Sequence, residues 1–243
     1  MIIDLLSAVI LTASAAIVVA VLSICLGANP ATRIRVAASL GFWFAVVVAL
    51  AATRVFDNTV GFGVRGLGIA VAVPIAILVV IFARVQSARE RLFRMPLGLL
   101  NGVQSVRVIG ILFVVLYANG RLPAPFAPIA GWGDIFVGVS APIIAWVTYK
   151  RARNTGAIVW LWNVVGLADL IVAVGLGAAS SPGPLRLFYS TPDAFLMTTL
   201  PWLLIPGFLV PLLATIHIGT LIRLTTTRDS IAVEPRLAVQ SIS

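Results

Sequence analysis

Charged residues are scarce in this sequence: only 10% of its 243 residues are charged, while 60% are apolar. Soluble domains average about 25% charged and about 45–50% apolar residues. The chain therefore has too few charges to cover a water-soluble surface of its size. The composition excludes a soluble enzyme, a disordered chain and a disulfide-rich scaffold, and it predicts an integral membrane protein.

Cysteine, histidine and lysine are almost absent, and each absence excludes a kind of site. Cys25 is the only cysteine, so no intrachain disulfide and no cysteine-based metal site can form. His217 is the only histidine, which excludes bis-histidine haem ligation within the chain and argues against a zinc site. The sole lysine, Lys150, lies between apolar runs, so no retinal Schiff base can form in a span. We expect no cofactor, and the absence of hydrolase and nucleotide-binding motifs favours a non-enzymatic role.

Long apolar runs dominate what is present. Seven of them are about long enough to cross the hydrocarbon core as helices. None shows the alternation of β-barrel strands, so we predict an all-α fold. It would form a single seven-helix transmembrane domain over residues 1–222, followed by a short cytoplasmic tail over 223–243. The predicted spans are 5–26, 36–52, 66–83, 97–118, 130–148, 156–178 and 196–222.

Basic residues gather in alternate loops. Twelve of the 17 Lys and Arg residues lie in the first, third and fifth loops and the C-terminal tail, and four lie in the other loops. An excess of Lys and Arg marks cytoplasmic loops, so we expect the N-terminus outside and the C-terminus in the cytoplasm. This distribution explains the net charge of +9 without a nucleic-acid partner. We expect anionic lipids at the basic loop 84–94.

Arg107 is the exception, because it lies about ten residues from each end of its predicted span and so near the bilayer midplane. A central arginine costs about 2.5–3.5 kcal/mol on insertion scales, so it must face the bundle interior and find an acceptor. Asn101 and Gln104 precede it at intervals of three residues, which predicts an inward-facing polar stripe.

Two aspartates can pair with Arg107. Asp169 lies near the middle of the span 156–178, and Asp134 lies about one turn inside the outer end of its own span. We predict a buried polar cluster of Arg107, Asp169 and Asn163, with Asp134 at its outer entrance. The cluster is either a functional site or a structural clamp between helices. We favour function, because one ion pair would not require the further polar residues.

The last predicted span contains Pro201, Pro206 and Pro211, each of which removes a helical hydrogen bond. This pattern is typical of a hinge or pathway, and the alternative is a kinked packing helix. His217 lies in the same span. We expect it to pack between helices, bonded to a neighbouring threonine or to water, with a proton relay as the alternative.

Several short strings resemble those of uncharacterised bacterial multi-pass membrane proteins over roughly residues 97–224. The resemblance implies a seven-helix protein of the bacterial cytoplasmic (inner) membrane and carries no activity with it. The strings are Gln104-Ser-Val-Arg107, Gly120-Arg-Leu-Pro123, Gly131-Trp-Gly-Asp134, Trp162-Asn163 with Asp169, and Pro206-Gly-Phe-Leu-Val-Pro211 with His217.

These features predict a small transporter or channel-like protein for an unidentified small solute or lipid, with a midplane polar site built on Arg107 and Asp169. One alternative is an intramembrane enzyme that acts on a lipid, with Asp169 or Asp134 as general acid or base. Another is a non-catalytic sensor or assembly subunit.

Overall fold

The computed structural model describes residues 2–56, 63–150 and 155–240, and within these ranges the chain forms helices and turns without a strand. The all-α class is therefore confirmed. The helices in chain order are α1 (Ile2–Leu26), α2 (Pro30–Ala52), α3 (Gly63–Arg84), α4 (Gln86–Arg94), α5 (Leu97–Gly102), η1 (Val103–Gly110), α6 (Ile111–Ala118), α7 (Phe126–Lys150), α8 (Thr155–Ala179), η2 (Ala194–Thr198), η3 (Ile205–Leu209) and α9 (Val210–Gln240).

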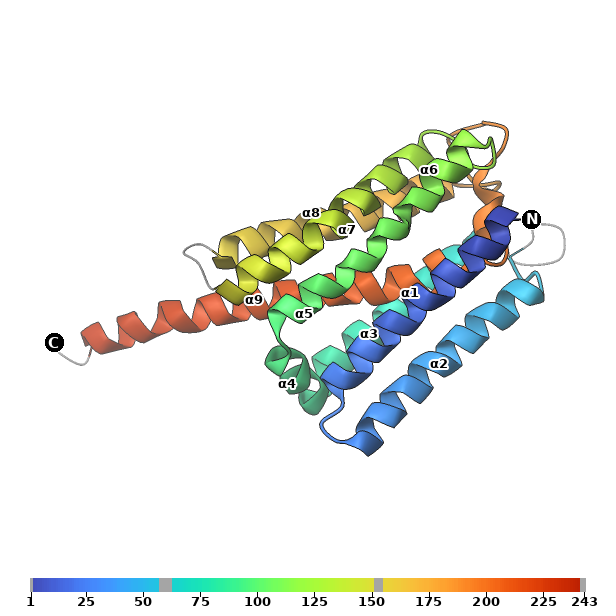
Figure 1. The fold of residues 1–243 in the computed structure, drawn as a ribbon. Helices are drawn as coiled ribbons and strands as arrows, with labels where there is room; N and C mark the ends of the chain where they lie inside the picture. Colours follow the sequence, from blue (N-terminus) through green and yellow to red (C-terminus); the bar gives the residue numbers. More distant parts are fainter. Residues whose placement is uncertain (1, 57–62, 151–154, 241–243) are drawn as a thin grey trace.

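Helix α9 runs between two groups of helices (Figure 1). On one side, α7 and α8 pack on each other, and α7 also packs along the continuous rod formed by α5, η1 and α6. On the other side, α1 packs on α2, and α3 packs on α9. Helix α1 also contacts η1, which joins the two groups. The start of α1 and the end of α9 lie at opposite ends of the bundle (Figure 1).

Within the described part of the chain, six helices are long and apolar enough to cross a membrane. They coincide with six of the seven predicted spans, and the chain is a multi-pass membrane protein. The remaining prediction, 66–83, falls on α3, whose described apolar stretch Val71–Phe82 is shorter than the others. The six helices are Ile2–Leu26, Pro30–Ala52, Leu97–Ala118, Phe126–Lys150, Thr155–Ala179 and Ile205–Thr226.

Large apolar side chains cover much of the outer surface. Phe42 on α2 is 73% exposed, and Trp146 on α7 is 61% exposed. A surface of this kind is stable against lipid chains, which are as apolar as leucine. It therefore agrees with the apolar helices in indicating a membrane environment.

The last helix differs from its predicted span at both ends. It begins with the π-helical turn η3 at Ile205, and α9 continues as a helix to Gln240 beyond the predicted end. Pro201 lies in the turns before η3, because proline lacks an amide proton and disfavours helical geometry at the preceding residue. Before it, the Asp193 carboxylate accepts a hydrogen bond from the Phe195 amide at 2.9 Å and caps the short η2.

One ion pair ties together three segments at the end of the bundle where α1 begins. Asp4 of α1 accepts a hydrogen bond from Arg121, in the turn after α6, at 2.8 Å. The Trp202 indole N–H donates to the same Asp4 oxygen at 3.2 Å. Trp202 is fully buried just before η3, so this contact fixes where the final helix starts relative to α1.

Gly138 allows α7 to pack directly on the backbone of η1. A Cβ atom at this position would lie 2.4 Å from the Val108 nitrogen. Backbone atoms cannot rotate away as a side chain can, so Gly138→Ala must push η1 off α7. We expect a destabilisation of about 1–3 kcal/mol, seen as a lower melting temperature in detergent.

The matched control is Gly175→Ala on α8, where an added Cβ would meet nothing within 4 Å. Alanine is the better helix former, so this variant should keep or raise the melting temperature. Equal melting temperatures for the two variants would contradict the close packing of α7 on η1.

Candidate functional site

The helix that carries Arg107 changes its geometry at this residue. Residues Val103–Gly110 form a 3₁₀ helix, η1, between the α-helical segments α5 and α6. Runs of 3₁₀ helix longer than three or four residues are uncommon, and a 3₁₀ stretch inside a helix often marks a functional hinge. Side chains three residues apart eclipse one another in this geometry. Gln104 and Arg107 are both buried, with at most 1% exposure.

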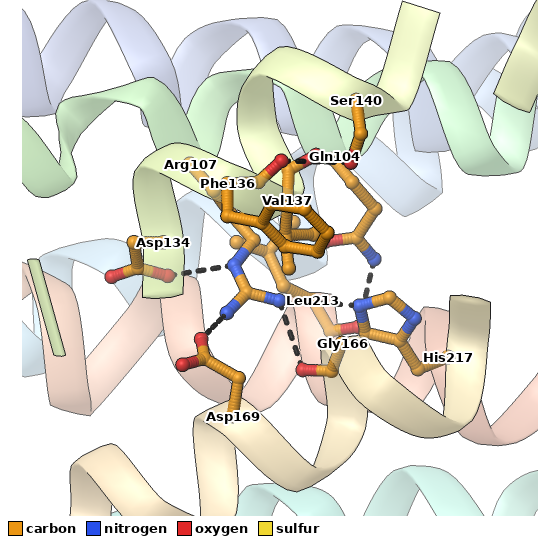
Figure 2. Close-up of polar contacts among 10 residues, drawn as sticks. All are labelled: Gln104, Arg107, Asp134, Phe136, Val137, Ser140, Gly166, Asp169, Leu213 and His217. Carbon is orange, nitrogen blue, oxygen red and sulfur yellow. Dashed lines mark hydrogen bonds and ion pairs between the residues drawn. The ribbon is translucent and has the colours of Figure 1, made fainter. Parts of the chain in front are cut away.

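Four groups accept hydrogen bonds from the Arg107 guanidinium (Figure 2). Its Nε donates to Asp134 Oδ1 of α7 at 2.6 Å, and its Nη2 donates to Asp169 Oδ2 of α8. Its Nη1 donates to the Gly166 carbonyl at 3.0 Å and to His217 Nε2 at 3.3 Å. All three guanidinium nitrogens are therefore bonded, and the cation joins η1 to α7, α8 and α9.

The structure places Asp134 differently from the prediction. Asp169 and Arg107 lie together, as the matching depths of their spans predict. Asp134 bonds Arg107 directly, instead of lying at an outer entrance to the cluster. Ionised, the three residues carry one positive and two negative charges. Their side chains are only 1%, 10% and 14% exposed for Arg107, Asp134 and Asp169.

Glycines on three helices make room for the cluster. A Cβ at Gly133 of α7 would lie 1.7 Å from Asp169 Oδ1, and one at Gly110 of η1 would lie 2.5 Å from the Asp134 Cβ. A Cβ at Gly166 of α8 would lie 2.5 Å from His217 Cε1. Gly133 and Gly110 were not predicted as site residues. The only sequence feature that could have identified them is that small residues are enriched where helices pack together in membranes.

His217 is fully buried and bridges Arg107 to Asn163. Because a guanidinium can only donate, His217 Nε2 must accept, and the ring proton lies on Nδ1. Nδ1 then donates to Asn163 Oδ1 at 2.8 Å. In this arrangement the imidazole is neutral. Its partners are Arg107 and Asn163, not the neighbouring threonines that we expected.

The hydrogen-bond chain continues beyond His217, and each group in it donates to the next. Asn163 Nδ2 donates to Asn101 Oδ1 at 3.1 Å, and Asn101 Nδ2 makes a long contact of 3.5 Å with the Thr148 hydroxyl. That hydroxyl donates to the Ile144 carbonyl at 2.6 Å. A chain of like-directed hydrogen bonds therefore runs from Arg107 toward the end of α7 at Lys150.

Gln104 is the least satisfied member of the predicted stripe. Its amide nitrogen donates to the Leu213 carbonyl of α9 at 3.1 Å. Its Oε1 atom is buried and accepts no hydrogen bond from the described residues. An unpaired buried amide oxygen costs about 1–3 kcal/mol, so this contact is a weak point between η1 and α9.

The three prolines proposed as a hinge lie before or within the first turns of the last helix. Pro206 is the second residue of η3, where a missing amide proton costs little, and Pro211 follows this π-helical turn inside the same continuous helix, Ile205–Thr226. Pro201 lies outside the helix. The Trp202 carbonyl, four residues before Pro206, still accepts a hydrogen bond from the Ile205 amide at 3.0 Å.

Four cavities in the described structure do not reach the cluster, because Arg107, Asp134, Asp169 and His217 line none of the four. Thr148, at the far end of the hydrogen-bond chain, lines the largest. Within the described residues, no three histidine, cysteine or acidic side chains gather as metal ligands would.

The model of a protein family described as a domain of unknown function (DUF8737) matches residues 64–225. The matched range begins in α3 and contains every residue of the cluster, and α1 and α2 lie outside it. No curated protein and no solved structure matches the chain. The expectation of a family without a known activity is confirmed.

Removing the cation tests how strongly the cluster holds the bundle together. Arg107→Gln leaves two buried carboxylates without their counter-charge. Breaking a buried ion pair in this way costs about 3–5 kcal/mol. We expect a large fall in the melting temperature of the purified protein in detergent.

The matched comparison adds Asp134→Asn and Asp169→Asn to Arg107→Gln, which removes all three charges while keeping similar shapes. We expect this triple variant to recover most of the lost stability. A triple variant no more stable than Arg107→Gln alone would show that the charges do not act on one another.

Proposed function

The chain belongs to the DUF8737 family, and we propose that it is a small membrane transporter that carries an anion together with a proton through a midplane site built on Arg107 and Asp169. The observation that supports this proposal is the charge of the site. One guanidinium faces two carboxylates in a buried place, which leaves one negative charge in excess when both are ionised.

An excess charge inside a membrane protein is costly, and it is tolerated where it serves an ion or proton pathway. A proton on one carboxylate removes the excess. Asp169 is the more accessible acceptor, because its side chain is 14% exposed against 10% for Asp134. Asp169 also lies against Gly133, which has no side chain to cover it.

The proton and the anion can share Arg107 in a simple cycle. When Asp169 takes a proton it loses its charge and its strong hold on Arg107, while Asp134 still holds Nε. The Nη2 edge of Arg107 is then open to a carboxylate, phosphate or similar anion, which guanidinium binds well. Loss of the proton restores the ion pair and expels the anion.

The irregular helices are where this cycle has room to move. Arg107 lies on the 3₁₀ segment η1, and the π-helical turn η3 opens the last helix. Both geometries mark functional sites more often than regular helix does. Movement of α8 relative to η1 then alternates access to Asp169 from the two sides.

The membrane arrangement that we propose has α3 as the seventh span, the N-terminus outside and the C-terminus in the cytoplasm of a bacterial inner membrane. The excess of arginine in alternate loops supports this orientation. The opposite positions of the start of α1 and the end of α9 suit an odd number of spans (Figure 1).

A second candidate is a non-catalytic scaffold or assembly subunit. The observation that favours it is the closure of the site: Arg107 is bonded at all three guanidinium nitrogens, and it lines none of the four cavities. In this case the cluster acts only as a clamp between helices.

Proteoliposomes with a pH-sensitive dye inside distinguish the two candidates. We expect an inward gradient of at least one anion from a panel of small carboxylates, phosphate and sulfate to acidify the lumen. Asp169→Asn should abolish this acidification, because an amide at this position cannot take up and release the proton.

The control is Asp193→Asn, which keeps a good helix cap far from the cluster. It should transport like the wild type. If the wild type moves no protons with any anion of the panel, or if Asp169→Asn moves them equally well, the transporter proposal is wrong and the scaffold is favoured.

A further inference from the structure

The largest of the four cavities lies where α5, α7, α8 and α9 meet, at the end of the bundle that contains Lys150. Its volume is about 1330 Å³. Two arginines line it, Arg94 at the end of α4 and Arg223 on α9, and none of its lining residues within the described part of the chain is acidic. Unlike the midplane cluster, the cavity therefore presents arginines and no carboxylate among its described lining residues.

Both arginines belong to the wall of the same cavity. Arg223 donates a hydrogen bond to the carbonyl of Met95, the residue that directly follows Arg94. Arg94 is 83% exposed, and its nearest carboxylate oxygen, on Glu90, is 3.9 Å away. That distance is too long for a strong hydrogen bond, so the Arg94 guanidinium keeps donors for a ligand.

Apolar side chains form most of the remaining wall. Leu97 and Leu99 of α5, Val159 of α8 and Leu224 of α9 all line the cavity. A site that combines two guanidinium groups with an apolar wall matches a ligand with an anionic head and a hydrocarbon tail. Guanidinium groups bind phosphate in paired, directional hydrogen bonds.

We propose that this cavity binds an anionic phospholipid, with the phosphate between Arg94 and Arg223 and an acyl chain along Leu97, Val159 and Leu224. The arginine-rich loop next to it, residues 84–94, belongs to the side that we predict to face the cytoplasm, where anionic lipids concentrate. The lipid is a specific ligand of the protein, additional to the transported anion of the midplane site.

Lipid titration followed by native mass spectrometry of the full chain in detergent tests this site. We expect the wild type to bind phosphatidylglycerol about tenfold or more tightly than phosphatidylcholine. Arg94→Gln combined with Arg223→Gln should remove this preference. Equal binding of the two lipids by the wild type, or an unchanged preference in the double variant, would overturn the proposal.

Arg33→Gln is the matched control for the loss of an arginine on the same side. Arg33 also donates to a backbone carbonyl, that of Gly27 at 3.2 Å, but it lines none of the four cavities. It should keep the full preference for phosphatidylglycerol. A preference lost equally in Arg33→Gln would show that general surface charge, and not this cavity, attracts the lipid.

Gly156→Leu tests the apolar wall with both arginines intact. Gly156 lines the cavity, and a Cβ there would meet nothing within 4 Å, so a larger side chain has room at this part of the wall. We expect phosphatidylglycerol affinity to fall severalfold. Unchanged affinity would overturn the proposed acyl position.

Soluble glycerol phosphate distinguishes a lipid site from a site for free anions. It should compete with phosphatidylglycerol only weakly, because it lacks the acyl chains. Equal competition would overturn the lipid assignment in favour of a soluble phosphate compound. Because these titrations need no gradient, they can fail while proton-coupled transport stands, and the reverse also holds.

Discussion

The arrangement of the bundle depends on one buried cation and its two carboxylates. Arg107 on η1 bonds Asp134 on α7 and Asp169 on α8. None of the three can reach water easily, so each helix that carries one must stay where its partners are. The glycines at these contacts follow from the same constraint: Gly138 brings α7 onto η1, and Gly133 leaves space for Asp169. The close packing of η1, α7 and α8 therefore brings these three charges together.

The fold class and most spans were predictable, because the length of an apolar run and its charge content are properties of the sequence alone. The irregular segments were not. Apolar periodicity does not distinguish the 3₁₀ geometry of Val103–Gly110 from an α-helix, since the two differ by only a fraction of a residue per turn. The last helix was predicted to begin at Leu196, because three prolines do not break a hydropathy pattern. In the structure, the residues around Pro201 form turns instead.

The equal depth of Arg107 and Asp169 along their spans predicted that the two residues lie together. Depth, however, gives only the position along the membrane normal and not the direction in which a residue faces around its helix. It placed Asp134 about one turn from the outer end and therefore away from the cation, whereas the arginine side chain is long enough to bond both carboxylates. The contact between His217 and Asn163 depends on how α8 and α9 are rotated against each other, and sequence spacing within one helix contains no such information. His217 can approach α8 closely because Gly166 has no side chain.

The central claim is that Asp169 takes up the proton that balances the excess negative charge of the cluster. Infrared difference spectroscopy of the protein in lipid, between high and low pH, detects the carbonyl stretch of a protonated carboxylic acid directly. The band should appear on acidification in the wild type. Asp169→Glu keeps the charge of the cluster and should shift the frequency of the band, because protonated aspartate and glutamate absorb at different frequencies, whereas Asp134→Glu should leave the band unchanged. A band that shifts in Asp134→Glu and not in Asp169→Glu would contradict the assignment of the proton to Asp169.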